Sequence, residues 1–178
     1  MGDSYLTEER LMIQAAAREF TMKEVLPVAN ELDPVQGDIP MDLRRKMGEL
    51  GYFGIRTPEE FGGLGLGVFE YCLITEELAR GWMSVASIIA RAGGVMGVHG
   101  WPKEKRIELT RKADKGEYLA AVSLSEPNVG SDLAAVSCRA VLDGNEWVIT
   151  GNKYWCTFAD GADYIQLLPR IEAPGDEA

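Results

Sequence analysis

The hydrophobic pattern of this sequence changes period near residue 117, and this change constrains the fold more than any other feature. Before it, apolar side chains recur at every third or fourth position, which is typical of amphipathic helices. From Tyr118 onward they tend to alternate, which is typical of half-buried strands. We therefore expect an α+β protein, with an N-terminal all-α helical bundle at residues 1–117 and an antiparallel β domain at residues 118–178.

Proline and glycine residues divide the helical part into separate segments. Pro27 should break or kink the first of them into two pieces, because proline has no N–H to donate within a helix. The segment at residues 83–98 is apolar on every side, as helices at the centre of a bundle are. The expected helices are residues 7–33, a short helix between Pro40 and Gly51, and residues 68–80, 83–98 and 102–115.

A glycine-rich stretch from Gly62 to Gly67 has two interpretations. A phosphate-binding loop would need a preceding strand and a following Gly-Lys-Ser or Gly-Lys-Thr, and the sequence has neither. We therefore interpret this stretch as a tight connection between packed helices.

The β domain is marked by short runs with a period of two. Asp143-Gly144-Asn145 between Leu142 and Glu146 is a hairpin signal. The last residues, from Pro169 onward, turn polar and supply no closing strand, so we expect the β domain to be incomplete. The expected strands are residues 118–124, 136–142, 146–150, 153–158 and 163–168.

Composition excludes several classes of function. The net charge of −10 argues against non-specific binding of nucleic acid, which requires a basic face. Three scattered cysteines and one histidine, His99, form neither a disulfide framework nor a metal site. No apolar run is long enough to span a membrane, and there is no secretory leader, so we expect a cytoplasmic protein.

The polar stretch from Ser123 to Asp132 follows an apolar run and is the first candidate for a site. Ser125 and Ser131 offer hydroxyl groups, and Gly130 allows backbone amides to approach a ligand. Glu126 and Asp132 are either an acid–base pair or structural residues that shape the loop, and the structural interpretation is favoured.

A second candidate lies in Lys153 to Thr157. If this segment is a strand, Trp155 and Thr157 point to the same face. An indole with a hydroxyl donor beside it suits a planar heteroaromatic cofactor. Packing of Trp155 in the core of the β domain is an equally good interpretation of the spacing alone.

Several motifs in register resemble the acyl-CoA dehydrogenase family. The run at residues 121–132, Ala-Val-Ser-Leu-Ser-Glu-Pro-Asn-Val-Gly-Ser-Asp, is similar to that family's Glu-Pro-x-x-Gly-Ser-Asp signature. Residues 151–157 resemble its Gly-x-Lys-x-Trp-Ile-Thr segment, and residues 58–65 and 76–80 also match in order. Val122 stands where many members have an aromatic residue, and Ser125 replaces the commoner threonine.

The resemblance implies FAD as cofactor, and a homotetramer or dimer whose subunits complete each other's flavin sites. It also implies that the β domain is the start of a β-barrel. By position, Leu124 and Ser125 would meet the flavin pyrimidine edge, Ser131 the pyrophosphate or the thioester arm, Trp155 the ring system and Thr157 flavin N5. The implied cofactor-binding residues are Leu124, Ser125, Gly130, Ser131, Trp155 and Thr157.

The implied reaction is α,β-dehydrogenation of an acyl-CoA thioester, with electron-transferring flavoprotein as the acceptor. Residues 82–92 resemble the helix that lines the acyl pocket. Arg80 and Ser84, together with Ser131, are the implied substrate-binding residues, and the first two have the spacing of the branch that binds a distal carboxylate. Candidates for acyl selectivity are Trp82, Met83, Ala86, Ile89 and Ala90.

No residue matches the family's catalytic base, a glutamate of its C-terminal helical domain, and we expect that domain to be absent from this chain. We therefore assign no catalytic residue. A non-catalytic subunit that binds flavin or a partner, and an oxygen-using relative such as an oxidase or monooxygenase, are the alternatives.

Overall fold

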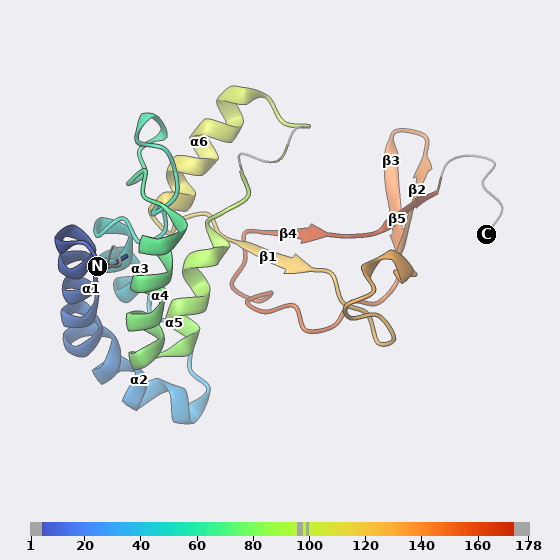
Figure 1. The fold of residues 1–178 in the computed structure, drawn as a ribbon. Coiled ribbons are helices and arrows are strands. Elements are labelled where there is room, and N and C mark those ends of the chain that lie inside the picture. Colours follow the sequence, from blue (N-terminus) through green and yellow to red (C-terminus); the bar gives the residue numbers. More distant parts are fainter. Residues whose placement is uncertain (1–4, 96–97, 99, 173–178) are drawn as a thin grey trace. The chain divides into compact units, whose positions relative to one another are not determined.

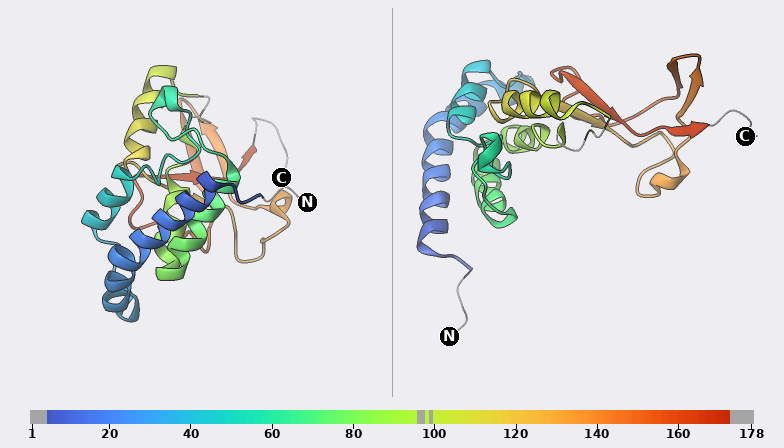
Figure 2. Two further views of the ribbon diagram at one scale, coloured as in Figure 1. Left: turned by 60° about the vertical axis from the view of Figure 1, so that its left-hand side comes forward. Right: turned by 90° about the horizontal axis from the view of Figure 1, so that it is seen from above.

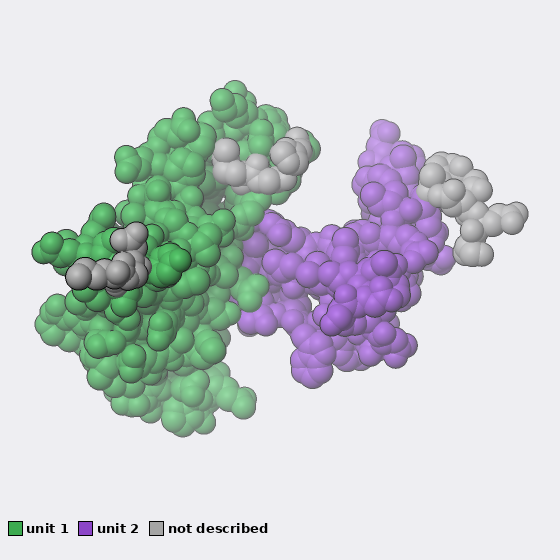
Figure 3. Space-filling view, in the orientation of Figure 1, with its two compact units in different colours: residues 1–119 green, residues 120–178 purple. Residues whose placement is uncertain are grey.

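The computed structural model describes residues 5–95, 98 and 100–172, so Met96 and His99 lie outside the described residues. The chain forms two compact units, residues 1–119 and 120–178 (Figure 3). Helices make up the first unit and strands the second, which confirms the expected α+β class.

The first unit begins with one long helical stretch that changes type along its length. Helix α1 runs over Glu8–Phe20 and begins at Thr7, whose hydroxyl accepts a hydrogen bond from the Arg10 N–H at 3.2 Å. A π-helical turn at Thr21–Val25 then leads into α2, Leu26–Leu32. The expected division near Pro27 takes the form of this π-helical turn, which lies just ahead of it, and the chain stays helical through both pieces. Pro27 itself lies in the first turn of α2.

The remaining helices lie close to their expected positions, with one exception. Helix α5 covers only Met83–Ile88 and passes into a 3₁₀ turn, so the expected helix at residues 83–98 is wrong in length. Gly94, with φ of 102°, cannot continue a right-handed helix. The other helices are α3 (Met41–Glu49), α4 (Val68–Gly81) and α6 (Lys103–Asp114), with 3₁₀ turns at Asp33–Val35, Glu59–Phe61 and Ile89–Arg91.

Helices α1 and α4 pack against each other (Figure 1). A buried charged side chain joins them. The Glu77 side chain of α4 is fully buried, and its carboxylate accepts hydrogen bonds from Gln14 at 3.0 Å and Arg18 at 2.7 and 3.0 Å. Arg18 hydrogen bonds lower the pKa of Glu77, so it is ionised in the fold. A buried carboxylate needs such donors, and its pairing with α1 fixes how the two helices align.

The second unit contains two small sheets, and the barrel is not closed. Strand β1 (Ala120–Ser123) pairs in parallel with β4 (Tyr164–Leu167). Strand β2 (Arg139–Asp143) pairs antiparallel with β3 (Glu146–Thr150) and parallel with β5 (Arg170–Glu172). A short 3₁₀ turn lies at Leu133–Ala135.

The strand expectations were met in part. The β2–β3 hairpin is as predicted (Figure 2). Asp143 lies opposite Glu146, and Gly144 lies in the tight turn with φ of 61°. Two of the three pairings are parallel rather than antiparallel, and β5 is a strand that was not expected. Residues 153–158 are not a strand.

Strand β3 is exposed along its whole length, including Trp147, Val148 and Ile149. It lies at one edge of its sheet. Within the described residues, no helix is both long and apolar enough to cross a lipid bilayer.

Candidate functional site

The two candidate segments of the second unit lie side by side. The Tyr154 N–H donates a hydrogen bond to the Ser125 carbonyl at 2.9 Å, and the Lys153 ammonium donates one to the Leu124 carbonyl at 2.8 Å. Residues far apart in the sequence are thereby joined at the end of β1. The loop that carries Ser125 and the loop that carries Trp155 form one continuous surface element.

Glu126 is the structural centre of this element. Its carboxylate accepts hydrogen bonds from the Ser137 N–H (2.7 Å) and hydroxyl (2.6 Å), the Cys138 N–H (2.8 Å) and the Lys153 ammonium (2.9 Å). The Ser137 hydroxyl and the Lys153 ammonium lower the pKa of Glu126 to about 2. A carboxylate so fully bonded is a poor base at neutral pH, which supports the structural interpretation over an acid–base role.

Asp132, the other member of the suggested acid–base pair, is exposed. It sits at the N-cap position of the 3₁₀ turn Leu133–Ala135, and its carbonyl accepts a hydrogen bond from the Ala135 N–H at 3.1 Å. Asp132 and Glu126 therefore both shape the loop.

The tip of the loop is tightly folded but open to solvent. Glu126 and Val129 exchange two backbone hydrogen bonds, with N···O distances of 2.9 and 3.1 Å. This turn presents Gly130 and Ser131, both exposed, and a Cβ added at Gly130 would meet no atom within 4 Å. The loop leaves space for a ligand at Gly130.

Trp155 is far more exposed than a core residue, with 87% of its surface accessible. Its backbone lies in the left-handed region, with φ of 58°, and its carbonyl accepts a hydrogen bond from the Thr157 N–H at 3.0 Å. The expectation that Trp155 and Thr157 share one face of a strand is therefore wrong. Core packing of the indole is also excluded, since the ring is held out from its unit next to Tyr154.

Arg80 and Ser84 lie on different helices, because Trp82 is extended between α4 and α5. Both are exposed, and the Arg80 Nε donates a hydrogen bond to Glu77 at 3.0 Å. Trp82 is buried, and its indole N–H donates to Asp33 at 2.7 Å. Trp82 is thus a packing residue of the helical unit.

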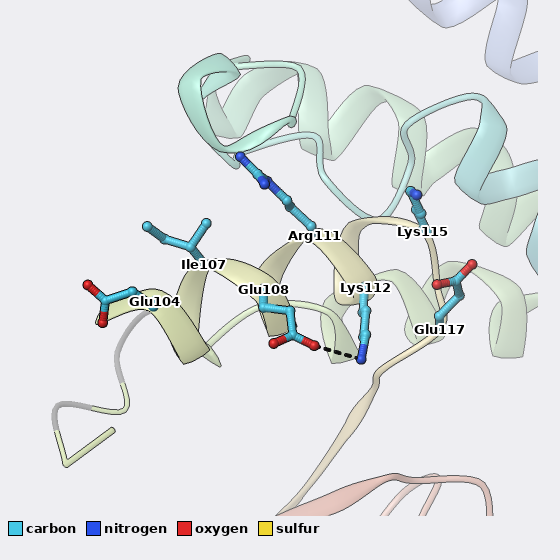
Figure 4. A pocket seen from close by; sticks show the side chains of 7 residues that line it. All are labelled: Glu104, Ile107, Glu108, Arg111, Lys112, Lys115 and Glu117. Atoms are coloured by element: carbon cyan, nitrogen blue, oxygen red, sulfur yellow. Dashed lines mark ion pairs between the residues drawn. The ribbon is translucent and has the colours of Figure 1, made fainter. Parts of the chain in front are cut away.

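Two hollows lie on the helical unit. The first has a volume of about 400 Å³, is lined largely by apolar residues and includes Ile89, Ala90 and the buried Thr110. The second, also about 400 Å³, lies along α6 (Figure 4). Its side chains carry charges of both signs and point in different directions, and Glu108 is paired with Lys112 at 2.9 Å. The hollow therefore offers no convergent donor set.

The glycine-rich stretch is a structural connection, as expected. The N–H groups of Leu64, Gly65 and Leu66 donate to the carbonyls of Gly54, Thr57 and Ile55, each at 2.9 Å. A Cβ at Gly63 would lie 2.2 Å from the Thr57 carbonyl oxygen. These amides are used within the fold and are not available to a phosphate.

Sequence reasoning missed Lys153 and Ser137. A lysine near a tryptophan gives no signal of burial, because its acceptors at Leu124 and Glu126 come from another segment. The only available hint was the place of Lys153 inside a motif that was singled out for Trp155.

The fold and the joined loops define a protein with a helical N-terminal unit and a β unit that presents a polar, aromatic-flanked edge. Residues 7–106 match the family described as acyl-CoA dehydrogenase, N-terminal domain, and residues 121–178 match acyl-CoA dehydrogenase, middle domain. The chain belongs to the acyl-CoA dehydrogenase family.

Individual relatives agree with this. The chain is 38% identical over 174 residues to (2S)-methylsuccinyl-CoA dehydrogenase of Cereibacter sphaeroides, covering 96% of this chain and 32% of the relative. An acyl-CoA dehydrogenase structure from Geobacillus kaustophilus superimposes with a TM-score of 0.79 at 32% identity, covering 92% of this chain and 43% of that one. At 24% identity, a glutaryl-CoA dehydrogenase from Mycobacterium smegmatis in complex with FADH2 shares the fold, with a TM-score of 0.81, covering 94% of this chain and 44% of that one. The chain thus spans less than half the length of these relatives.

Proposed function

We propose that this protein takes part in the FAD-dependent α,β-dehydrogenation of an acyl-CoA thioester to the 2-enoyl-CoA. One observation carries the proposal: the Tyr154–Ser125 hydrogen bond joins a polar loop to an exposed indole. Membership of the acyl-CoA dehydrogenase family supports the same reaction class.

The residues of the second unit fit a flavin. Gly130 has open space around it, Ser131 is an exposed hydroxyl donor, and Trp155 offers an exposed aromatic face. In this proposal Leu124 and Ser125 hold the pyrimidine edge, Gly130 and Ser131 the pyrophosphate, and Trp155 and Thr157 the ring system near N5. When bound, FAD would accept the β-hydrogen of the substrate as a hydride, that is, with the two electrons of its C–H bond.

The substrate would be an acyl-CoA. Ile89 and Ala90, which line the hollow of the helical unit, are the residues we propose to influence acyl selectivity. Arg80 and Ser84 are proposed contacts for the distal end of the acyl group. The thioester arm is the alternative partner of Ser131, in place of the pyrophosphate. The α-proton must leave to a base, and we assign that role to no residue of this chain.

The same proposal includes a homo-oligomer, either a tetramer or a dimer, and electron-transferring flavoprotein as the electron acceptor. We also propose a cytoplasmic location. Cys72, Cys138 and Cys156 are all free thiols, which suits a reducing compartment.

Flavin titration and anaerobic reduction test the proposal. The protein that contains this sequence, purified and loaded with FAD, should lose the yellow colour of its oxidised flavin when an acyl-CoA is added without oxygen. Acyl-CoAs of short, medium, branched and dicarboxylic type should be tried in turn. If none of them reduces the flavin, the dehydrogenase proposal is wrong; rapid oxygen consumption by the reduced protein would instead indicate an oxidase or monooxygenase.

A further inference from the structure

We propose that Lys153 is a positioning residue, whose ammonium group fixes the Leu124–Ser125 peptide so that the Ser125 N–H is presented to the flavin. This inference rests on the proposed function, because it concerns the same cofactor edge. It assigns to Lys153 a role that acts through the backbone and involves no contact with the reacting atoms.

The Lys153 ammonium is buried between two acceptors from the other loop. Only 8% of the Lys153 side chain is exposed, and the ammonium lies 2.8 Å from the Leu124 carbonyl oxygen and 2.9 Å from the Glu126 carboxylate. A buried ammonium is costly unless it is paired and hydrogen-bonded, so these two acceptors hold it in place. Lys153 therefore connects the two loops through buried contacts.

Glu126 gives this connection a fixed reference point. Its side chain is 2% exposed, and its remaining bonds go to Ser137 and Cys138, immediately before β2. Because these donors include two backbone N–H groups, the carboxylate cannot turn without breaking several bonds at once. Lys153 is thereby fixed relative to the β2–β3 sheet.

The contact with Lys153 also sets the direction of the Ser125 N–H. The Leu124 carbonyl and the Ser125 N–H belong to one peptide group, and in a trans peptide these two bonds point in opposite directions. Since the carbonyl points to Lys153, the Ser125 N–H points away from it. In the described part of the chain, no backbone carbonyl accepts a hydrogen bond from this N–H. In this proposal the Ser125 N–H is the donor that an external acceptor such as a pyrimidine carbonyl would take.

The neighbouring hydrogen bond reports on the same arrangement. The Tyr154 N–H donates to the Ser125 carbonyl at 2.9 Å, so its protection from exchange depends on the two loops staying together. Hydrogen exchange at Tyr154 therefore measures positioning without any flavin present.

The test uses Lys153→Met, which keeps most of the side-chain volume and removes the charge. Lys112→Met is the matched control, because Lys112 forms an exposed ion pair with Glu108. We expect Lys153→Met to speed amide exchange at Tyr154 by about tenfold or more while Val148 in β3 is unaffected, and to weaken FAD binding by a similar factor. The control should change neither quantity. Unchanged exchange at Tyr154, or unchanged FAD affinity despite faster exchange, would overturn the inference.

A double variant separates positioning from loss of folding. Glu126→Gln combined with Lys153→Met leaves no unpaired buried charge, so it should fold more stably than Lys153→Met alone. Its Leu124 carbonyl still lacks the ammonium, so FAD binding should stay weak; recovery of FAD binding along with stability would show a merely structural role. If the parent protein binds no FAD while Tyr154 responds as expected, the proposed function is what fails.

Discussion

The carboxylate of Glu126 lies 2.9 Å from the ammonium of Lys153, and both side chains are almost fully removed from solvent. This pair joins two motifs that are more than twenty residues apart in the sequence. Glu126 therefore anchors a loop, as the favoured structural interpretation of this carboxylate predicted.

Glu126 should make the stability of the β unit sensitive to acid. The Ser137 hydroxyl and Lys153 lower its pKa to about 2. The folded state therefore stabilises the ionised carboxylate, and ionisation of Glu126 stabilises the fold. This contribution is fully present above the unfolded pKa of about 4.3 and is lost as the pH falls toward 2. Glu126→Gln should be less stable than the parent at pH 7, and the difference should shrink below about pH 4.

The stability difference is measured by urea unfolding at a series of pH values, with hydrogen exchange of the β2 and β3 amides as the signal that reports on the β unit. Glu146→Gln is the control, since Glu146 is an exposed carboxylate of the same unit. It should keep the pH dependence of the parent. A constant difference between the parent and Glu126→Gln from pH 7 to pH 2 would contradict the prediction.

Gly130→Ala should separate ligand binding from folding. The added methyl group meets no atom of the protein within 4 Å, so stability should change by less than about 0.5 kcal/mol. A cofactor that approaches the Gly130 backbone would meet the methyl group, and FAD affinity should fall about tenfold, or about 1.4 kcal/mol. Gly100→Ala, which also has open space, is the control and should alter neither. Equal FAD affinity in both variants would remove Gly130 from the site.

Trp155→Ala should likewise affect binding more than stability. The indole is 87% exposed, so its removal should change the free energy of unfolding by less than about 0.5 kcal/mol. Loss of an aromatic stacking partner should weaken FAD binding by about tenfold, measured by quenching of flavin fluorescence. Trp147→Ala, another exposed indole of the same unit, should leave FAD binding unchanged. If both variants lose FAD equally, the effect is not specific to the ring of Trp155.

Local patterns predicted most of the elements and few of the contacts between them. Helix α4 and the turn at Asp143-Gly144-Asn145 are each determined by residues close together in the sequence, and both form where they were predicted. The pairing of β1 with β4 depends on residues about forty positions away, so its parallel direction could not be read from either strand.

The segment at residues 153–158 shows why part of the site was missed. Its tyrosine, tryptophan, threonine and phenylalanine favour a strand by propensity. Tertiary contacts override this preference, because Lys153 and Tyr154 bond to the loop at Leu124 and Ser125, and Trp155 and Phe158 adopt positive φ angles. The sequence therefore identified candidate residues of the site from their chemical type. It did not predict their backbone conformation or their contacts.

Arg80→Ala should change substrate preference at little cost in stability. Glu77 keeps both hydrogen bonds to Arg18 and one to Gln14, so the loss of Arg80 should cost less than about 1 kcal/mol. Arg18 and Arg80 share this one carboxylate, and the side chain of Arg80 is half exposed, which leaves its positive charge accessible at the helix surface. If that charge binds a distal carboxylate, Arg80→Ala should weaken binding of a dicarboxylic acyl-CoA about tenfold relative to a monocarboxylic one of equal length. Isothermal titration with both thioesters measures the ratio, and Arg45→Ala, at an exposed pair with Asp42, is the control. Equal losses for the two thioesters would show that Arg80 does not recognise the carboxylate.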